Sequence, residues 1–142
     1  MKIEKKYSIE VGIDSQQVIQ FLEDRIYEHN STSIDKDDGL LFSRIVRDEN
    51  NDVIGGVAGW TWARVCEITQ LWVDEKVRGM GIGKMLLEAA EAEARNKGCV
   101  TALVKSYSFQ SPHFYERYGY KIEHILYGFP EGHRYYTLTK RV

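Results

Sequence analysis

The sequence predicts a mixed α/β fold in a single domain that spans residues 1–142. Segments with the period-2 alternation of strands and segments with helical spacing follow one another in the order β-α-β-β-β-α-β-α-β-β. Polar turns between several strands indicate antiparallel hairpins, whereas the helix predicted at 82–97 lies between two strands and requires a crossover connection. The sheet is therefore expected to be mixed, with helices packed against it.

Length and composition agree with this fold class. A chain of 142 residues is close to the usual size of one domain, about 150 residues. Hydrophobic residues make up 43% and charged residues 28%, as in ordinary globular proteins. The 19 basic and 21 acidic residues give a net charge of −2, which argues against a dedicated nucleic-acid-binding protein.

The sequence also indicates where the protein is expected to be located and whether it is expected to bind a metal. No apolar run approaches the 18 residues of a membrane span, and the charged start of the chain leads into no apolar segment typical of a secretory signal. Cys66 and Cys99 are too few for a disulfide framework, so reduced thiols in a cytoplasmic protein are expected. The 4 histidines and 2 cysteines lack the spacing of metal ligands, and no metal is expected.

The first half of the chain is expected to hold one helix and four strands. Asp14 or Ser15 can cap the helix, which is expected to end near His29 because Val18, Ile19, Leu22 and Ile26 have helical spacing. Polar segments predict a loop at 30–39 and a hairpin turn at 48–52. A second hairpin turn is expected at Arg64 and Val65. The strands are predicted at 7–11, 40–47, 53–63 and 66–73.

The second half contains two predicted helices and three predicted strands. The helix at 82–97 has one apolar face and is expected to end at Gly98, which can adopt a left-handed conformation. A shorter helix is expected at 111–118. The strands are predicted at 101–107, 121–127 and 134–139.

A glycine-rich loop between the fourth strand and its following helix is the most informative segment. Gly79, Gly81 and Gly83 lie where the helix begins, so the backbone there can approach a ligand closely. The first N–H groups of a helix lack intrahelical partners and carry a partial positive charge. With Arg78 and Lys84 beside them, these groups predict a site for a phosphate or pyrophosphate.

Two common phosphate-binding motifs do not fit this loop. The Walker motif requires four residues between its glycines and a hydroxyl for magnesium, but only three residues separate Gly79 from Gly83, and Met85 follows Lys84. The dinucleotide fingerprint requires a glycine where Lys84 stands. An Arg-x-x-Gly-x-Gly pattern remains, and the alternative is a glycine turn that only joins a strand to a helix.

Residues 77–83 resemble the acetyl-CoA pyrophosphate loop of the GNAT superfamily of N-acetyltransferases. Residues 70–73 are similar to that family's strand 4, residues 54–57 to its glycine-bearing strand 3, and residues 114–120 to its Phe-Tyr-x-x-x-Gly-Phe/Tyr segment. The resemblance covers about residues 40–142 and, more loosely, the first helix. Residues 128–136 resemble the corresponding segment of a bacterial subgroup of small single-domain members. It implies a mostly antiparallel sheet of about six or seven strands with about three or four helices, and a V-shaped split between strands 4 and 5.

The resemblance also implies the reaction. An amine would take the acetyl group of acetyl-CoA directly in a ternary complex, without a metal. Main-chain N–H groups of the Leu71, Trp72 and Val73 stretch would donate to the thioester oxygen. The pyrophosphate would be bound by the loop, with Arg78, Gly79, Met80, Gly81, Ile82, Gly83 and Lys84 as the expected cofactor-binding residues.

Two side chains are candidates for proton transfer. By the resemblance Tyr115 would protonate the departing thiolate, although a tyrosine there could also be a packed aromatic residue. Glu67 is the candidate general base, since some members of the family have a catalytic glutamate in this region. Simple alternation places Glu67 on one strand face with Thr69, Leu71 and Val73. The alternative for Glu67 is a solvated strand carboxylate.

The segment before the short helix departs from the family pattern. Residues 109–113 lack the asparagine that many members have there, and Ser111 could replace it as a helix cap or as a contact to the pantetheine arm.

The acceptor side of the fold would be acidic and aromatic, which suits a cationic amine. Its candidate residues are Asp35–Asp38, Trp60, Trp62, Glu67 and Tyr127. A small primary amine is expected, with a protein lysine or N-terminal amine as the alternative. A second alternative is a coenzyme A-binding regulatory module without turnover. The aromatic segment 127–136 could support a homodimer.

Overall fold

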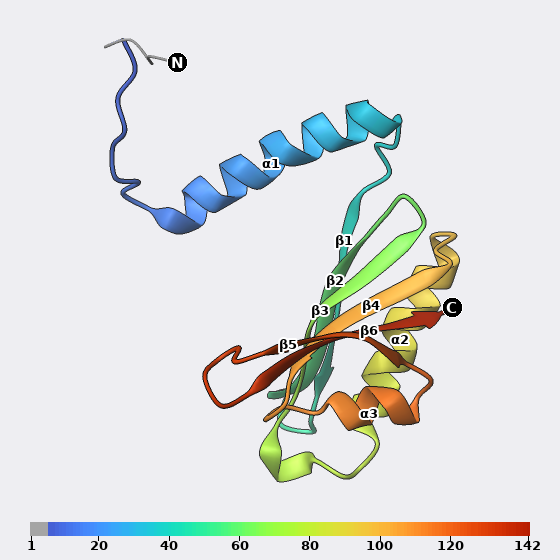
Figure 1. Cartoon of the computed structure of the whole chain (residues 1–142). Coiled ribbons are helices and arrows are strands. Elements are labelled where there is room, and N and C mark those ends of the chain that lie inside the picture. Colours follow the sequence, from blue (N-terminus) through green and yellow to red (C-terminus); the bar gives the residue numbers. More distant parts are fainter. Residues whose placement is uncertain (1–5) are drawn as a thin grey trace. The chain divides into compact units, whose positions relative to one another are not determined.

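The computed structural model describes residues 6–142, and the chain divides into two compact units (Figure 1). One unit ends at Asp37 and contains the first helix, and the other spans Asp38–Val142 and contains the whole sheet. The expectation of one domain across residues 1–142 stays a prediction.

The first unit is built around α1 (Ser15–Ile34). The Asp14 carboxylate accepts hydrogen bonds from the backbone N–H groups of Gln16 (3.1 Å) and Gln17 (3.3 Å), so the predicted N-cap is confirmed. The helix continues five residues beyond the predicted end, through a segment expected to be a loop. The Ser33 hydroxyl donates to the helical carbonyl of His29 (2.7 Å), so the polar side chain follows the helix instead of breaking it.

The strand predicted at 7–11 is wrong, because residues 7–12 have no regular secondary structure. Alternating side chains indicate which residues could lie on a sheet, but a strand forms only where its backbone pairs with a neighbour. The six-stranded sheet begins with β1 (Leu40–Arg47), and no neighbour within it pairs with residues 7–12.

The second unit has a six-stranded mixed sheet in the order β1-β2-β3-β4-β6-β5, which confirms the predicted fold class. Only β3 and β4 are parallel, and α2 (Ile82–Asn96) forms the crossover between them. Two short helices complete the unit, the 3₁₀ turn η1 (Glu75–Val77) and α3 (Pro112–Arg117). The other strands are β2 (Val53–Trp62), β3 (Val65–Val73), β4 (Thr101–Tyr107), β5 (Lys121–Tyr127) and β6 (Arg134–Arg141).

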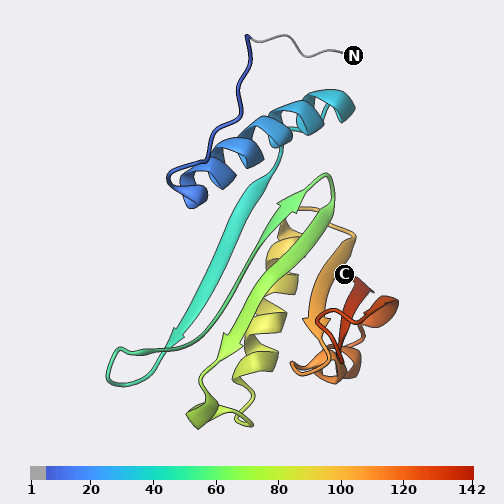
Figure 2. The same cartoon turned by 60° about the vertical axis from the view of Figure 1, so that its left-hand side comes forward.

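Helix α2 packs against one face of the sheet (Figure 2), and the core between them includes residues of β1, β2, β3, β4 and β6. The apolar face of α2 buries Leu86, Leu87, Ala90 and Ala94, which have the spacing of one helical stripe. They pack in one cluster with residues such as Val57 and Ile68 of the sheet. This burial fixes where α2 begins relative to the end of β3, and it therefore positions the glycine loop.

The hairpin between β2 and β3 turns at Ala63 and Arg64, one residue earlier than predicted, and both have positive φ angles of 50° and 68°. Such angles are costly for residues other than glycine, asparagine and aspartate. The Asp38 carboxylate accepts the N–H of Ala63 (3.1 Å), and the Arg64 Nε donates to the Gly98 carbonyl (3.3 Å). These contacts compensate for the strained turn.

Across residues 6–142 no helix is both long and apolar enough to cross a membrane.

Candidate active site

The sheet splits between β3 and β4. Residues Val65–Ile68 pair with Thr101–Val104, but beyond this point the two strands no longer pair with each other. A cleft of about 940 Å³ opens there, lined by the ends of both strands, the glycine loop and α3. The split expected between the fourth and fifth predicted strands is thus confirmed in the second unit.

A β-bulge at Thr69 starts the divergence. Gly59 of β2 opposes Ile68, and the next residue, Ala58, opposes Gln70, which leaves Thr69 as an extra residue in β3. Gly59 is required there, because a Cβ atom would collide with the backbone carbonyl of Glu67. Residues 70–73 pair with β2 only, so their other edge presents unpaired backbone groups to the cleft.

The bulge corrects one prediction about β3. Simple alternation placed Glu67 on the same face as Leu71 and Val73, but the extra residue reverses the alternation. Leu71 and Val73 pack toward the core cluster, whereas Glu67 lies on the opposite face of the strand. Sequence periodicity could not reveal this reversal, because it depends on the pairing with β2.

The glycine loop forms an open backbone surface at the start of α2. Gly79 and Gly81 have φ angles of 82° and 84°, and nothing lies within 4 Å of where their Cβ atoms would be. Gly81 is the N-cap of α2, and no side chain caps the helix. The first-turn N–H groups of α2 are therefore available to an anionic ligand, with the partial positive charge of the helix terminus behind them.

Neighbouring contacts hold this loop in place. The Arg78 Nε donates to the Val73 carbonyl (3.0 Å), which ties the guanidinium to the end of β3. Gly83 serves a different purpose from the other glycines, since a Cβ atom there would lie 3.3 Å from the Phe114 ring. The absence of a side chain at Gly83 lets α2 and α3 approach closely.

Tyr115 lies in α3 and lines the same cleft. Its ring packs edge-on against Phe114 (5.2 Å) and Tyr120 (5.8 Å), measured between ring centroids. Burial raises the pKa of the Tyr115 phenol above its usual value, because removal from water disfavours the phenolate. The hydroxyl therefore stays protonated at neutral pH, which suits a proton donor and not a base.

Glu67 forms an ion pair with Lys105 of β4 (Oε1 to Nζ, 3.5 Å). Its side chain is 16% exposed, and Glu67 itself does not line the cleft, whereas Lys105 does. The pair therefore lies beside the cleft, near the point where β3 and β4 separate.

The structure brings most of the predicted site residues together. Met80 is 74% exposed and does not line the cleft. Ser111 is the N-cap residue of α3, but its side chain makes no capping hydrogen bond. The predicted residues that line the cleft are Leu71, Trp72, Val73, Arg78, Gly79, Gly81, Ile82, Gly83, Lys84, Ser111 and Tyr115.

Sequence reasoning missed several cleft residues, among them Lys105, Phe109 and Arg117. Phe109 is 58% exposed and stacks on Tyr107 (5.1 Å between centroids, 4° between planes), which in turn stacks on Tyr135 (4.3 Å). The aromatic residues of 107–109 and 127–136 were a signal for this stack. Their mutual contact depends on the pairing of β4 with β6 and was not readable from either segment.

No group of three or more metal-ligating side chains occurs in the part of the chain that the structure describes.

Comparison with known proteins identifies the family. Residues 8–120 match the model of the acetyltransferase (GNAT) family. The blasticidin-S acetyltransferase of Streptomyces morookaense is 37% identical over 98 residues, which cover 66% of this chain and 70% of that protein. A crystal structure of an acetyltransferase from Bacillus cereus is 32% identical, with a TM-score of 0.80 over 96% of this chain and 98% of that one.

A further solved relative has its ligand bound. The structure of a GNAT family acetyltransferase from Elizabethkingia anophelis with acetyl-CoA is 25% identical, with a TM-score of 0.58 over 67% of this chain and 72% of that one. The matches span most of the second unit and extend into the first. The chain belongs to the GNAT family and is an N-acetyltransferase.

Proposed function

We propose that this N-acetyltransferase moves the acetyl group of acetyl-CoA directly to the amine of a small molecule. One observation carries the proposal: the uncapped glycine loop of α2 and the protonated Tyr115 line one cleft. A pyrophosphate and a thioester are two parts of the same acetyl-CoA molecule, and the cleft offers a binding group for each.

The backbone of the glycine loop would bind the pyrophosphate. Donors there are the N–H groups of residues 79–84, with Met80 and Ile82 contributing backbone only. Arg78 and Lys84 supply positive charge, and the bond from Arg78 to Val73 keeps its guanidinium oriented. A metal is not needed to balance the phosphate charge in this scheme, because the helix terminus and the two cations do so.

The open edge of β3 and Tyr115 would act on the thioester. Backbone N–H groups in the Leu71–Val73 stretch point from this edge and would stabilise the negative charge that develops on the carbonyl oxygen. The amine nitrogen bonds to the carbonyl carbon, the carbon–sulfur bond breaks, and the sulfur takes the Tyr115 proton. The raised pKa of Tyr115 keeps that proton available until the sulfur becomes basic.

The proton lost by the amine requires an acceptor, and we assign this role to Glu67 acting through water. The carboxylate lies beside the cleft and not in it, so direct contact with the amine is not proposed. Lys105 bridges the gap between Glu67 and the cleft wall and would orient the carboxylate. The Glu67→Gln variant is expected to lower kcat without changing KM for acetyl-CoA.

A small-molecule acceptor is supported by the named substrate of the Streptomyces relative, which is a blasticidin-S acetyltransferase. The exposed Phe109 ring at the cleft rim offers a flat apolar surface for such a molecule. Ser111 lines the same cleft and would contact the pantetheine arm. A homodimer through 127–136 remains a separate proposal.

The test is a panel of amines with acetyl-CoA, followed by release of free thiol. It would contain blasticidin S, polyamines, amino sugars, amino-acid amides and lysine peptides. We expect turnover with at least one small amine and none with the peptides. Turnover restricted to peptides would overturn the small-molecule assignment, and inertness across the whole panel would contradict the proposed activity.

A further inference from the structure

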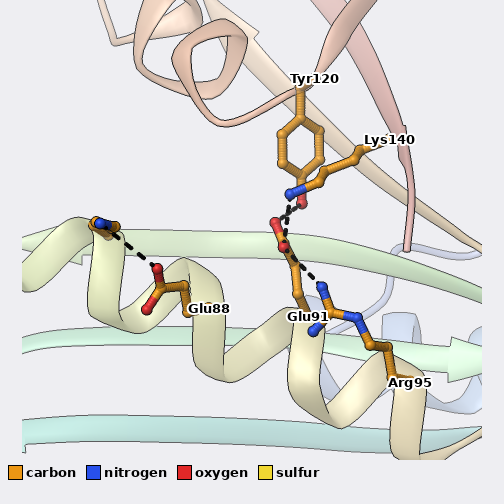
Figure 3. Close-up of polar contacts among 6 residues, drawn as sticks. Glu88, Glu91, Arg95, Tyr120 and Lys140 are labelled. Carbon is orange, nitrogen blue, oxygen red and sulfur yellow. Dashed lines mark hydrogen bonds and ion pairs between the residues drawn. The ribbon is translucent and has the colours of Figure 1, made fainter.

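A buried carboxylate outside the proposed reaction path is held by three partners. Glu91 of α2 is 4% exposed. Its Oε2 accepts the Tyr120 hydroxyl (2.9 Å), and its Oε1 accepts the Lys140 ammonium (2.8 Å) and lies 3.5 Å from the Arg95 guanidinium (Figure 3). These contacts connect α2 with β6 and with the segment between α3 and β5.

The cluster is costly if its only purpose is stability. Removing a carboxylate and an ammonium from water carries a large penalty, and apolar residues of similar volume often stabilise a core as well or better. The remainder of the buried α2 face is apolar, with leucine and alanine side chains. The presence of the charged Glu91 among these apolar residues is therefore better explained by the residues that it holds in place than by stability alone.

The cluster holds Tyr120, and Tyr120 contacts Tyr115 in two ways. The Tyr120 backbone N–H donates to the Tyr115 carbonyl (3.1 Å). The two rings also pack edge to face, with centroids 5.8 Å apart and planes at 72°. Because the far end of the Tyr120 ring is bound to Glu91, the surface against which the Tyr115 ring packs is tied to α2.

The Lys140 side chain restrains the same ring from a second direction. Its ammonium lies 5.6 Å from the Tyr120 ring centroid while it bonds to Glu91. Two oxygens of one carboxylate thus fix both the phenol and the cation that flanks it. The result is a rigid chain of contacts from α2, whose start carries the glycine loop, to the Tyr115 ring.

We propose that Glu91, Tyr120 and Lys140 form a positioning cluster that fixes the Tyr115 ring relative to the glycine loop. The inference rests on the proposed role of Tyr115 as proton donor. The three residues touch neither substrate nor cofactor in this scheme, and they act on the reaction through Tyr115 alone. Their loss is therefore expected to affect kcat and not KM for acetyl-CoA.

The Tyr120→Phe variant tests this inference most cleanly. It keeps the ring, so packing against Tyr115 is preserved in the folded protein, and Glu91 keeps its two cationic partners. Removal of the phenol hydroxyl frees the ring from α2. We expect kcat to fall by at least about twofold but by less than in Tyr115→Phe, because a displaced donor keeps part of its effect, with KM for acetyl-CoA unchanged.

A double-mutant cycle with Tyr115→Phe separates positioning from stability. If Tyr120 acts through Tyr115, the Tyr120→Phe change lowers kcat in the natural enzyme but by less than about twofold when Tyr115 is already phenylalanine. Glu91→Gln, which removes the charge that Lys140 binds, is a second variant and should show the same dependence on Tyr115. Thr139→Val is the control, because it deletes a hydroxyl next to Lys140 in β6 that donates to Glu123 of β5, and it should leave kcat unchanged.

The outcomes distinguish this inference from the proposed function. If Tyr115→Phe lowers kcat but the loss from Tyr120→Phe is equally large in both backgrounds, the positioning role is wrong and the proton-donor role stands. If Tyr115→Phe leaves kcat unchanged, the proton-donor role and the inference built on it both fall. Thermal unfolding of each variant is measured alongside, so that kcat is calculated per folded enzyme molecule.

Discussion

At the scale of single residues, the proposed chemistry depends on the hydroxyl of Tyr115. Tyr115→Phe removes the proton donor but keeps the ring that packs against Phe114 and Tyr120. We expect kcat to fall about 10²- to 10⁴-fold, the usual contribution of a general acid, with KM for acetyl-CoA unchanged. Steady-state kinetics checks this prediction.

Tyr136→Phe is the matched control for that experiment. Tyr136 is buried in β6 and does not line the cleft, whereas Tyr115 is half-buried, so the same atom is removed from a more deeply buried tyrosine outside the site. Its kcat should equal that of the natural enzyme. Equal losses in the two variants would indicate that burial of a tyrosine, and not its position in the cleft, explains the effect.

The two cysteines are predicted to be inert in the folded protein. Burial raises the pKa of the Cys66 thiol to about 12 and also raises that of Cys99, so both remain protonated at pH 8, where a thiolate would be needed for reaction. A disulfide reagent should therefore detect no thiol until denaturant is added, and then both. Rapid labelling of the folded enzyme would contradict this burial and would also interfere with the thiol-release assay.

At the scale of elements, the glycine loop can be tested against a matched glycine at the other end of the same helix. Gly81 and Gly98 have φ angles of 84° and 77°, and both have free space where a Cβ atom would be. Alanine at either position costs about 1 kcal/mol of stability through backbone strain. Only Gly81→Ala should raise KM for acetyl-CoA, because only Gly81 belongs to the proposed phosphate site.

The comparison of the two alanine variants is measured by thermal unfolding and by KM. Similar drops in melting temperature with a rise in KM for Gly81→Ala alone would support the loop assignment. A rise of the same size for Gly98→Ala would show that general destabilisation is the cause.

The hairpin between β2 and β3 offers a prediction about stability. Ala63 has a φ angle of 50°, where alanine is strained and glycine is not. Ala63→Gly is therefore expected to raise the free energy of unfolding by about 0.5 kcal/mol, and chemical denaturation would measure it. Ala58→Gly, within β2, lacks this gain and should be destabilising. Destabilisation by both would mean that the contact from Asp38 fully relieves the strain at Ala63.

The elements that the sequence predicted well are those with strong local signals. The bounds of β1, β4 and β5 agree with the predictions, and α2 ends one residue earlier than expected. The strand at 7–11 failed because pairing with a distant strand decides whether an alternating segment is a strand. The bulge at Thr69 was missed for the same reason, and with it the face on which Glu67 lies.

At the scale of the sheet-bearing unit, the site is assembled from two parts. β1, β2, β3 and α2 carry the glycine loop, whereas β4, β5, β6 and α3 carry Tyr115. The parts meet along the short parallel pairing of β3 with β4 and through the contacts of Glu91 with Tyr120 and Lys140. The order of motifs along the chain predicted the residues of both parts, but the contacts that align them required the structure.

The most direct test of the central claim is a crystal structure of the enzyme with coenzyme A. The account predicts diphosphate oxygens within hydrogen-bond distance of the backbone N–H groups of residues 79–84, and the coenzyme's sulfur beside the Tyr115 hydroxyl. A coenzyme bound outside this cleft, or a diphosphate bound by side chains with the loop amides left free, would contradict it.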